Sequence, residues 1–395
     1  MTSEWHEVSL RELVGYISKG IAPSYAEEAS ETTIRVLNQK CNRNFRISYG
    51  DSRLHDTLKK KVPPERYVKP DDILINSTGA GTAGRIAQIE DVPSATTIDG
   101  HMILLRSNGK VTQKFLGYAL KAHQWEVLQL DEGSTGQTEL NRDRLLDEIM
   151  INYPVSFDEQ NAIVGTLESI DRKLIVNKEI NDNLQQQAFS VFDNLIANAE
   201  NNDYTVSDYA FLNPKRRLAK NQVARSIDMS QLSTRGAFPS SWEIKPFNGG
   251  MRFTNGDTLL ARITPCLENG KTAFIDFLDD GEVAFGSTEY IVLAPKNDTP
   301  PEMLYCLARY PAFVDYAVKN MNGSSGRQRV SAETVGQYRL PLFDKHSLVL
   351  FKEVVSPMFL KMSYNFLENM RLAELRDALL PKLMSGEIDV SAVQL

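Results

Sequence analysis

The sequence predicts a mixed α/β (α+β) protein in which one order of strands and helices occurs twice along the chain. Two globular domains would be joined by two long antiparallel coiled-coil helices in a pseudo-twofold arrangement. Three observations predict it: an internal repeat, a matching order of strands and helices in both copies, and two heptad patterns of apolar residues. The expected boundaries are residues 1–157 for the first globular domain, 158–203 for the central helix, 204–345 for the second domain and 346–395 for the C-terminal helix.

The first predicted helix carries the heptad pattern of a coiled coil. Steps of four and three residues alternate over ten positions, eight of which are apolar. These positions are Ile163, Leu167, Ile170, Leu174, Asn177, Asn181, Leu184, Ala188, Val191 and Leu195. The second helix is less regular, because Arg376 falls on a seam position and Pro357 is expected to kink or end the first turns. The simplest partner for each helix is the other one.

The internal repeat is clearest at the middle of these helices. Its members recur 188 positions later: Asn177, Asn181 and Leu184 as Asn365, Asn369 and Leu372. In an antiparallel pair the four asparagines, Asn177, Asn181, Asn365 and Asn369, would meet and set the coiled-coil register, the best-attested use of a buried asparagine. The alternative is that they face solvent on two unrelated helices. A helix of forty residues would be roughly 60 Å long and could hold two domains apart.

Each globular copy has the same predicted order of elements. A buried strand opens it, further strands and a helix follow, and a polar turn leads to a last strand that ends near the long helix. In the first copy these elements are expected at residues 72–77, 85–89, 98–105, 115–128, 133–137, 140–146 and 149–154. In the second copy they are expected at residues 258–263, 273–277, 290–293, 303–319, 323–328 and 338–342.

Composition and charge restrict the class of protein. The N-terminus is too polar for a secretory signal and no run of about 18 apolar residues occurs, so a soluble cytoplasmic protein is expected. Three separated cysteines predict neither disulfides nor a zinc site. The net charge of −7 is concentrated in residues 158–204, which contain nine acidic and three basic residues. That helix is a poor partner for phosphates, whereas residues 59–61 and 215–217 form local basic clusters.

Catalytic and cofactor motifs are sparse. Residues 79–84 match the GxGxxG dinucleotide fingerprint, but the next residues predict a strand and the second copy has no glycines there, so a tight hairpin is the preferred interpretation. The histidines are isolated, with no metal-ligand spacing. Neither a P-loop nor the Asn/Asp-Pro-Pro-Tyr tetrapeptide of amino-methyltransferases occurs. An enzyme that works alone is therefore disfavoured, and no metal site is expected.

Several motifs resemble the specificity subunit of type I restriction–modification enzymes. Residues 375–388, LRDALLPKLMSGEI, are similar to the end of that family, and residues 170–174 with Asn177 and Asn181 are similar to its central helix. The loop at residues 134–137 and the entry at residues 19–23 resemble recurrent parts of its target-recognition domains. The second copy departs from the pattern at residues 325–327 and lacks a clear counterpart of residues 19–23.

The resemblance implies a non-catalytic DNA-binding subunit that acts in phage defence. Each target-recognition domain would read one half of an asymmetric bipartite site in double-stranded DNA. The helices would set the spacing and dock two methyltransferase (modification) subunits. S-adenosylmethionine, ATP and Mg would be bound by those subunits and by translocase–nuclease (restriction) subunits, with no cofactor in this chain. A protein of another class, a scaffold with two peptide- or glycan-binding domains on a coiled-coil spacer, is the alternative.

Candidate DNA-binding residues are the polar and basic side chains of the predicted loops, because such groups hydrogen-bond to base edges and phosphates. In the first domain they are Asn76, Ser77, Thr78, Arg85, Ser134, Thr135 and Gln137. In the second domain they are Lys215, Arg216, Arg217, Arg262, Lys271, Ser324, Arg327, Gln328 and Arg329.

Overall fold

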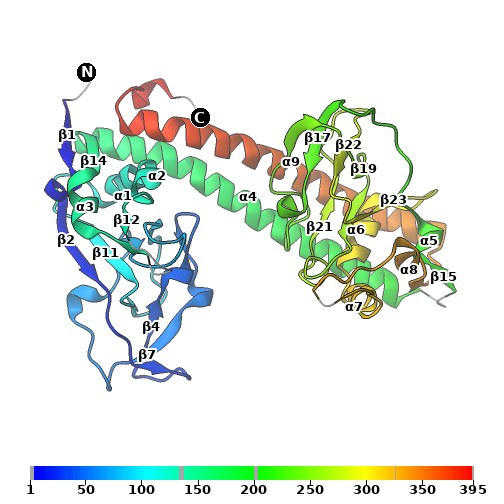
Figure 1. Ribbon diagram of the computed structural model, residues 1–395, viewed down its shortest axis with the longest axis horizontal. Helices are drawn as coiled ribbons and strands as arrows, with labels where there is room; N and C mark the ends of the chain where they lie inside the picture. Colours follow the sequence, from blue (N-terminus) through cyan, green and yellow to red (C-terminus); the bar gives the residue numbers. More distant parts are fainter. Residues whose placement is uncertain (1–3, 133–137, 200–202, 325, 394–395) are drawn as a thin grey trace. The chain divides into compact units, whose positions relative to one another are not determined.

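The chain consists of two compact units, each an α+β head with part of two long helices. A computed structural model describes residues 4–132, 138–199, 203–324 and 326–393. Unit 1 comprises Met1–Arg172 and Ala373–Leu395, and unit 2 comprises Lys173–Leu372. The long helices are α4 (Phe157–Ala197) and α9 (Lys345–Met384), so the division between the units falls inside both helices (Figure 1). The predicted fold class, with its mixed heads and long helices, is confirmed.

The main sheet of unit 1 is antiparallel and buried on both faces. Its strands are ordered β2 (Val14–Lys19), β11 (Met102–Ser107), β8 (Ile73–Asn76) and β9 (Ile86–Gln88). Alternate side chains of a strand point to opposite faces. Ile73 and Ile75 therefore join the larger core with helix α1 (Gln113–Ala122), while Leu74 joins a smaller core on the other face. This explains why the strand reads as a continuous apolar run.

A second sheet and several short elements complete the head of unit 1. The sheet is ordered β10 (Thr96–Ile98), β4 (Thr33–Leu37), β7 (Arg53–Asp56) and β3 (Tyr25–Ala26), and only β10 and β4 are parallel. The first and last strands of this head, β1 (Trp5–Ser9) and β14 (Met150–Pro154), pair with each other. The remaining elements are β5 (Asn42–Arg43), β6 (Arg46–Ile47), α2 (Gln124–Val127), β12 (Asp131–Glu132), β13 (Glu139–Leu140) and α3 (Arg142–Glu148).

The head of unit 2 repeats this topology. Its main sheet is ordered β16 (Ala210–Leu212), β23 (Tyr290–Pro295), β20 (Thr258–Ala261) and β21 (Thr272–Phe274), again antiparallel. Its second sheet is ordered β18 (Glu243–Pro246), β17 (Val223–Ile227), β22 (Ala284–Gly286) and β19 (Met251–Phe253), with β17 and β22 parallel. The two second sheets share three strands and differ in the fourth, which is β3 beside β7 in unit 1 and β19 beside β22 in unit 2.

The rest of unit 2 consists of short helices and one strand pair. Strand β15 (Tyr204–Thr205) pairs with β24 (Arg339–Leu340), as β1 pairs with β14 in unit 1. The helices are α5 (Val206–Tyr209), α6 (Pro301–Arg309), α7 (Pro311–Lys319) and α8 (Ala332–Gly336), and α6 packs on the main sheet (Figure 1).

Three sequence-based expectations about helices are corrected. The single helix expected over residues 115–128 is α1 followed by α2, and the one expected over residues 303–319 is α6 followed by α7. The second break follows from Pro311, which stands at the first turn of α7 and cannot continue α6. Pro357, in contrast, does not end α9. Pro357 and Glu353, whose carbonyl loses its helical donor, are both exposed, so water can serve that carbonyl.

Residues 79–84 do not open a helix. They lead directly into strand β9, and Gly79, Gly81 and Gly84 all have positive φ. A β-carbon on Gly84 would also lie 2.8 Å from the carbonyl oxygen of Val127. Glycine is therefore required here by backbone conformation and close packing. The GxGxxG motif serves a tight turn, which is the interpretation that the sequence favoured.

Candidate nucleic-acid interface

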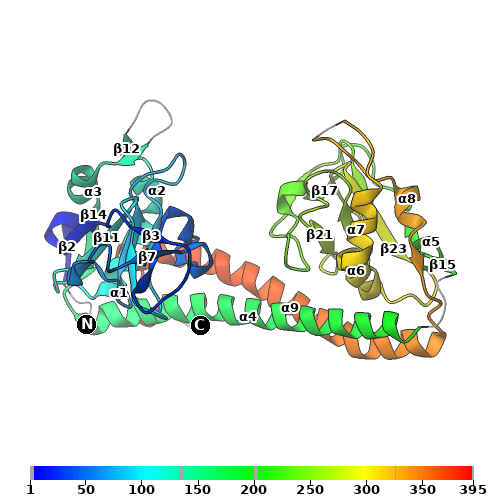
Figure 2. The ribbon, with the colours of Figure 1, turned by 90° about the horizontal axis from the view of Figure 1, so that it is seen from below.

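The polar loops of unit 2 meet where β20 ends and β23 begins. Since these strands are antiparallel, Ala261 lies opposite Tyr290, and the next residues, Arg262 and Glu289, are neighbours. The amide of Arg262 donates to the carbonyl of Glu289 (3.0 Å), and the amide of Val330 donates to the carbonyl of Arg262 (3.0 Å). Residues 322–324 and 326–330 lie between α7 and α8 (Figure 2). Hydrogen bonds and bridges at residues 328–330 hold this segment at the end of the sheet. We call residues 262–264, 289, 322–324 and 326–329 the unit 2 loop edge.

The unit 2 loop edge carries three arginines, two of which lie beside one carboxylate. Arg329 donates to Glu289 from Nε to both Oε1 (3.0 Å) and Oε2 (2.9 Å), and from Nη2 to Oε1 (2.7 Å). Arg262 Nε lies 4.0 Å from Glu289 Oε2, and Arg327 is exposed. The hydrogen bonds from Arg329 hold the pKa of Glu289 below its usual range. Glu289 is therefore a carboxylate at neutral pH, and the edge keeps a net positive charge.

The same hydrogen bonds build an equivalent edge in unit 1. The amide of Ser77 donates to the carbonyl of His101 (2.8 Å), and the amide of Leu140 donates to the carbonyl of Ser77 (2.8 Å). Ser77 thus corresponds to Arg262, and His101 corresponds to Glu289. Residues 77–78, 101 and 138–140 form the unit 1 loop edge.

The side chains at the two loop edges differ. Thr78 Oγ1 and His101 Nδ1 are 2.7 Å apart and share a hydrogen bond. Glu139, which corresponds to Arg329, forms an ion pair with Lys19. The backbone frame is therefore shared, whereas the side chains of unit 1 are neutral or acidic where those of unit 2 are basic.

Two of the unit 1 candidates are structural. Asn76 and Ser77 are fully buried. Asn76 accepts a hydrogen bond from Asn42 Nδ2 (3.1 Å) and donates to the carbonyl of Gln39 (3.2 Å), so its amide ties a loop to the sheet. Burial makes both side chains inaccessible to a base edge, and their assignment as DNA contacts is corrected.

The other unit 1 candidates divide into two groups. Thr78 is partly accessible, and Arg85 is exposed, with Nη2 donating to the carbonyl of Gly81 (3.2 Å). Both remain candidates for contact with DNA. Ser134, Thr135 and Gln137 lie outside the described residues.

Among the unit 2 candidates, the assignment of Arg216 as a DNA contact is corrected. Its Nη2 lies 2.7 Å from Oδ1 of Asp257, a buried residue at the start of β20. Burial raises the pKa of Asp257 to about 6, and Arg216 opposes that shift. In unit 1 the corresponding Asp72 pairs instead with Arg106, on β11, at 2.7 Å. Each head thus needs an arginine against this aspartate and takes it from a different position, which a count of basic clusters could not reveal.

The remaining unit 2 candidates keep some accessibility. Lys215, Arg217, Ser324 and Arg327 are exposed. Lys271 is half-buried, and its Nζ donates to the carbonyl of Met229 (2.7 Å), which leaves it mainly a structural role. The backbone of Gln328 is bonded to Thr264, so its side chain lies at the loop edge.

The four asparagines of the helix pair lie together within unit 2. Asn177 Nδ2 donates to Asn369 Oδ1 (2.9 Å), and Asn365 Nδ2 donates to Asn181 Oδ1 (2.8 Å). Asn369 also donates to the carbonyl of Leu174 (3.2 Å), and Asn181 to that of Met362 (3.0 Å). Each bond has a counterpart 188 positions away, so the group is locally twofold symmetric and the helices are antiparallel here. A shift of either helix would break all four bonds.

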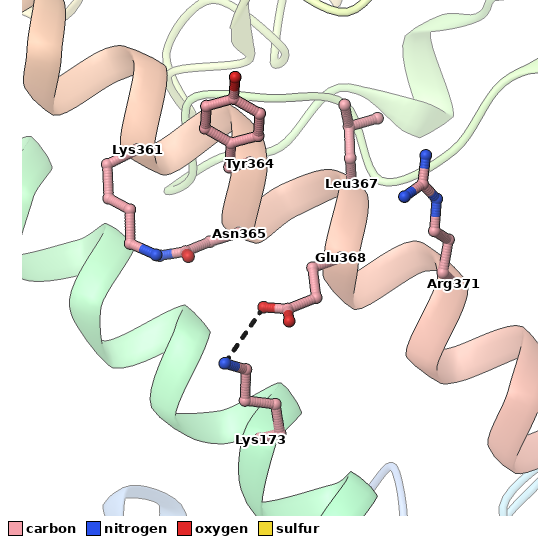
Figure 3. Close-up of a pocket in the computed structure, with 7 residues that line it drawn as sticks. All are labelled: Lys173, Lys361, Tyr364, Asn365, Leu367, Glu368 and Arg371. Carbon is pink, nitrogen blue, oxygen red and sulfur yellow. Dashed lines mark ion pairs between the residues drawn. The ribbon is translucent and has the colours of Figure 1, made fainter. Parts of the chain in front are cut away.

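A shallow pocket beside this group is lined mostly by polar residues. Lys173 on α4 forms an ion pair with Glu368 on α9 (3.4 Å) (Figure 3). Asn177 donates to the same carboxylate (2.6 Å). These contacts lower the pKa of Glu368, the hydrogen bond from Asn177 most. The other lining residues are Lys361, Tyr364, Asn365, Leu367 and Arg371. The ion pair adds a second polar link between the helices.

The register of the helices can be tested by substitution within this group. We expect Asn365→Ala to lower the free energy of unfolding of unit 2 by about 1–2 kcal/mol, because Asn181 Oδ1 loses its donor in a mostly buried place. Asn181→Leu combined with Asn365→Leu should recover that loss, since both polar partners are then removed. Chemical denaturation measures the change. The control is Asn183→Ala, an exposed asparagine of α4; an equal effect of both alanine variants would contradict the interpretation.

In unit 1 the helix pair is held by a charged group that the sequence did not single out. Asp171 Oδ2 accepts hydrogen bonds from Lys121 Nζ (2.9 Å) and Tyr118 Oη (3.0 Å), and Oδ1 accepts from Arg376 Nη1 (3.1 Å). Arg376 was the irregular seam residue of α9, and Asp171 lies in the family-like segment 170–174. The arginine is explained by this aspartate, which a pattern of apolar residues does not detect.

The described residues show neither a metal-binding cluster nor a membrane-spanning helix. Across residues 4–132, 138–199, 203–324 and 326–393, no group of three or more His, Cys, Asp or Glu side chains is placed to hold a metal ion. Within the same ranges, no helix is both long and apolar enough to cross a membrane. The structure brings polar residues together at one loop edge on each head. It also brings together the asparagines that hydrogen-bond between α4 and α9.

Comparison with known proteins finds a family match over the first part of the chain. Residues 2–186 match the family model described as the type I restriction modification DNA specificity domain. The chain is 34% identical over 133 residues to the type I restriction enzyme EcoAI specificity subunit of Escherichia coli, and 31% identical over 143 residues to the EcoEI specificity subunit of Escherichia coli. These alignments cover 32% and 35% of the chain, but only 22% and 24% of the relatives.

A solved structure extends the likeness in fold to nearly the whole chain. The S subunit of a type I restriction-modification system from M. genitalium has a TM-score of 0.62 and 15% sequence identity, covering 97% of this chain and 99% of that one. Residues 2–186 are thus similar to the type I restriction modification DNA specificity domain family, in agreement with the resemblance that the sequence indicated.

Proposed function

We propose that this chain is the DNA sequence-specificity subunit of a type I restriction–modification system. Each unit reads one half of an asymmetric bipartite site in double-stranded DNA. The helix pair sets the spacing of the two halves and docks two methyltransferase subunits. The chain performs no catalysis itself: S-adenosylmethionine binds to the methyltransferase partners, and ATP and Mg to restriction subunits.

The observation that carries the proposal is that one backbone frame presents different side chains in the two units. His101 and Glu139 in unit 1 correspond to Glu289 and Arg329 in unit 2, through equivalent backbone hydrogen bonds and bridges. Base pairs differ in the donors and acceptors that they present in the major groove. Different side chains at equivalent positions therefore select different base pairs, which supports an asymmetric target.

The distribution of charged and apolar side chains supports DNA as the partner of the heads and protein as the partner of the helices. Lys215, Arg217 and Arg327 are exposed on the unit 2 head and can meet phosphates, which position a protein on DNA without reading its sequence. The acidic residues of α4 would repel phosphates. Exposed apolar side chains on the helices within unit 2 suit a protein partner instead, as expected for docked methyltransferase subunits: Val176, Ile180, Leu360 and Tyr364.

The proposal is tested by methylation in a cell. The chain is expressed with the methyltransferase subunit of its restriction–modification system, in a host that lacks other type I systems, and N6-methyladenine is mapped across the genome. We expect one motif with two dissimilar specified halves and an unspecified spacer of fixed length. The same methyltransferase without this chain should leave the motif unmethylated.

A complex that assembles but yields a continuous motif, or no methylation at any site, would contradict the proposal. The second outcome would instead favour a scaffold that binds peptides or glycans.

A further inference from the structure

The unit 2 loop edge contains an arginine whose orientation is set by a carboxylate. Arg329 presents Nε and Nη2 to Glu289 in the two-pronged geometry of a guanidinium–carboxylate pair. Its Nη1 donates to the carbonyl of Arg327 (3.2 Å). The side chain of Arg329 is 38% exposed, so the pair lies at the surface. A free surface arginine samples many rotamers, whereas this one is held at both edges of its guanidinium.

The contacts just described leave donors for a further partner. A guanidinium carries one N–H on Nε and two on each terminal nitrogen. Glu289 and the carbonyl of Arg327 use the Nε hydrogen and one hydrogen on each terminal nitrogen. One N–H on Nη1 and one on Nη2 stay available. A paired donor of this kind matches guanine, whose O6 and N7 are adjacent acceptors in the major groove.

The surroundings of the pair favour a base over a phosphate as the partner of Arg329. Arg262 lies beside the same carboxylate, and its buried Nε has no hydrogen-bond partner among the described residues. Arg327, two residues before Arg329 in the same loop, is exposed and supplies positive charge for the DNA backbone. A carboxylate is of no advantage for holding a phosphate, because it cancels charge. Its advantage is to fix the direction of the guanidinium, which matters for reading a base.

We propose that Glu289 is a positioning residue that holds Arg329 in place to read a guanine in the half-site of unit 2. The inference rests on the proposed function. Arg329 makes the base contact, and Glu289 acts only through Arg329. Unit 1 does not read guanine in this way, because its equivalent positions hold Glu139 and His101.

The test uses the complete complex of this chain with its methyltransferase, and genomic DNA as the probe. Arg329→Lys keeps the positive charge but removes the paired donors. We expect methylation at the wild-type motif to fall about tenfold or more, with the preference for guanine lost at one position of one half-site. Glu289→Gln should relax the same position, because the amide no longer orients the guanidinium. The other half-site should be unchanged in both variants.

A double variant separates a positioning role from a direct one. If Glu289 acts through Arg329, Glu289→Gln should have no additional effect on the motif in the Arg329→Lys background. The matched control is Lys345→Ala, which removes an exposed cation paired with Asp298, beyond the opposite end of β23. It should leave the motif and the methylation level unchanged.

Two outcomes would overturn the inference and leave the proposed function intact. One is an unchanged bipartite motif in Arg329→Lys and Glu289→Gln, which would make the pair a structural link of the hairpin. The other is a uniform loss of methylation with no change in base preference, which would make Arg329 a phosphate contact. Absence of a bipartite motif with the wild-type chain would contradict the proposed function itself.

Discussion

Asp171→Ala is expected to destabilise unit 1 by about 3 kcal/mol, because it leaves two cations without their shared carboxylate. Removing one partner of a buried ion pair costs roughly 3–5 kcal/mol. The lower figure applies because Asp171 and Arg376 are 24% and 22% exposed, although Lys121 is only 12% exposed. Burial alone would raise the pKa of Asp171, but Lys121 and Arg376 together hold it below its usual range.

The lowered pKa gives this prediction a pH dependence with a defined sign. A carboxylate whose folded pKa lies below its unfolded value stabilises the protein above the unfolded pKa, and that contribution is lost as the pH falls through the folded pKa. The difference in unfolding free energy between wild type and Asp171→Ala should therefore be full at neutral pH and shrink in acid. Denaturation curves at several pH values measure it.

The control for Asp171 is a solvent-exposed ion pair in the same unit. Asp147 pairs with Arg11 on the surface and is 56% exposed, so Asp147→Ala should cost well under 1 kcal/mol. Equal losses in the two variants at neutral pH would show that Asp171 is no more than a surface charge.

Phe359→Ala is expected to destabilise unit 2 by about 3–5 kcal/mol, the usual cost of removing a buried aromatic ring. Phe359 is fully buried on α9, and its ring packs edge-on against Phe274 (5.1 Å between centroids) and Tyr305 (5.5 Å) of the head. The same helix that carries the asparagines therefore completes the core of unit 2. Loss of the ring leaves a cavity that the surrounding sheet and α6 cannot fill.

The adjacent residue provides the matched control for Phe359. Leu360 is 52% exposed, and Leu360→Ala should change the unfolding free energy by less than about 1 kcal/mol. Chemical denaturation of both variants measures the contrast. Similar effects at positions 359 and 360 would mean that α9 does not pack on the unit 2 head as described.

The repeated architecture could be predicted because its signals are local. Apolar residues at heptad spacing identify a helix seam without knowledge of its partner. Ile163 and Leu167 are indeed buried in the unit 1 core, and Ile170 is buried as well. The buried strand β8 was found in the same way, from a continuous apolar run. Helix breaks are less predictable from the sequence, because Pro311 separates α6 from α7 whereas Pro357 lies within the continuous helix α9.

The loop edges show where local signals end. Residue type alone could not separate Arg216, which neutralises a buried aspartate, from Arg217, which is exposed beside it. Nor could it find Glu289, which is distant in sequence from Arg329 and meets it only because β23 begins beside the end of β20. Comparison of the two copies at the 188-residue offset, which relates His101 to Glu289, was the one signal that could have drawn attention to this position.

The duplicated α+β plan, the helix seam and the resemblance to the specificity-subunit family are all predictable from the amino-acid sequence. They follow from periodicity and short motifs, which depend on neighbours along the chain. The folded chain was needed to show which polar side chains are buried, which arginine meets which carboxylate, and how the asparagines bond across α4 and α9. The reason is physical: hydrogen bonds and ion pairs act over about 3 Å in space, and antiparallel strands and helices bring together residues far apart in sequence.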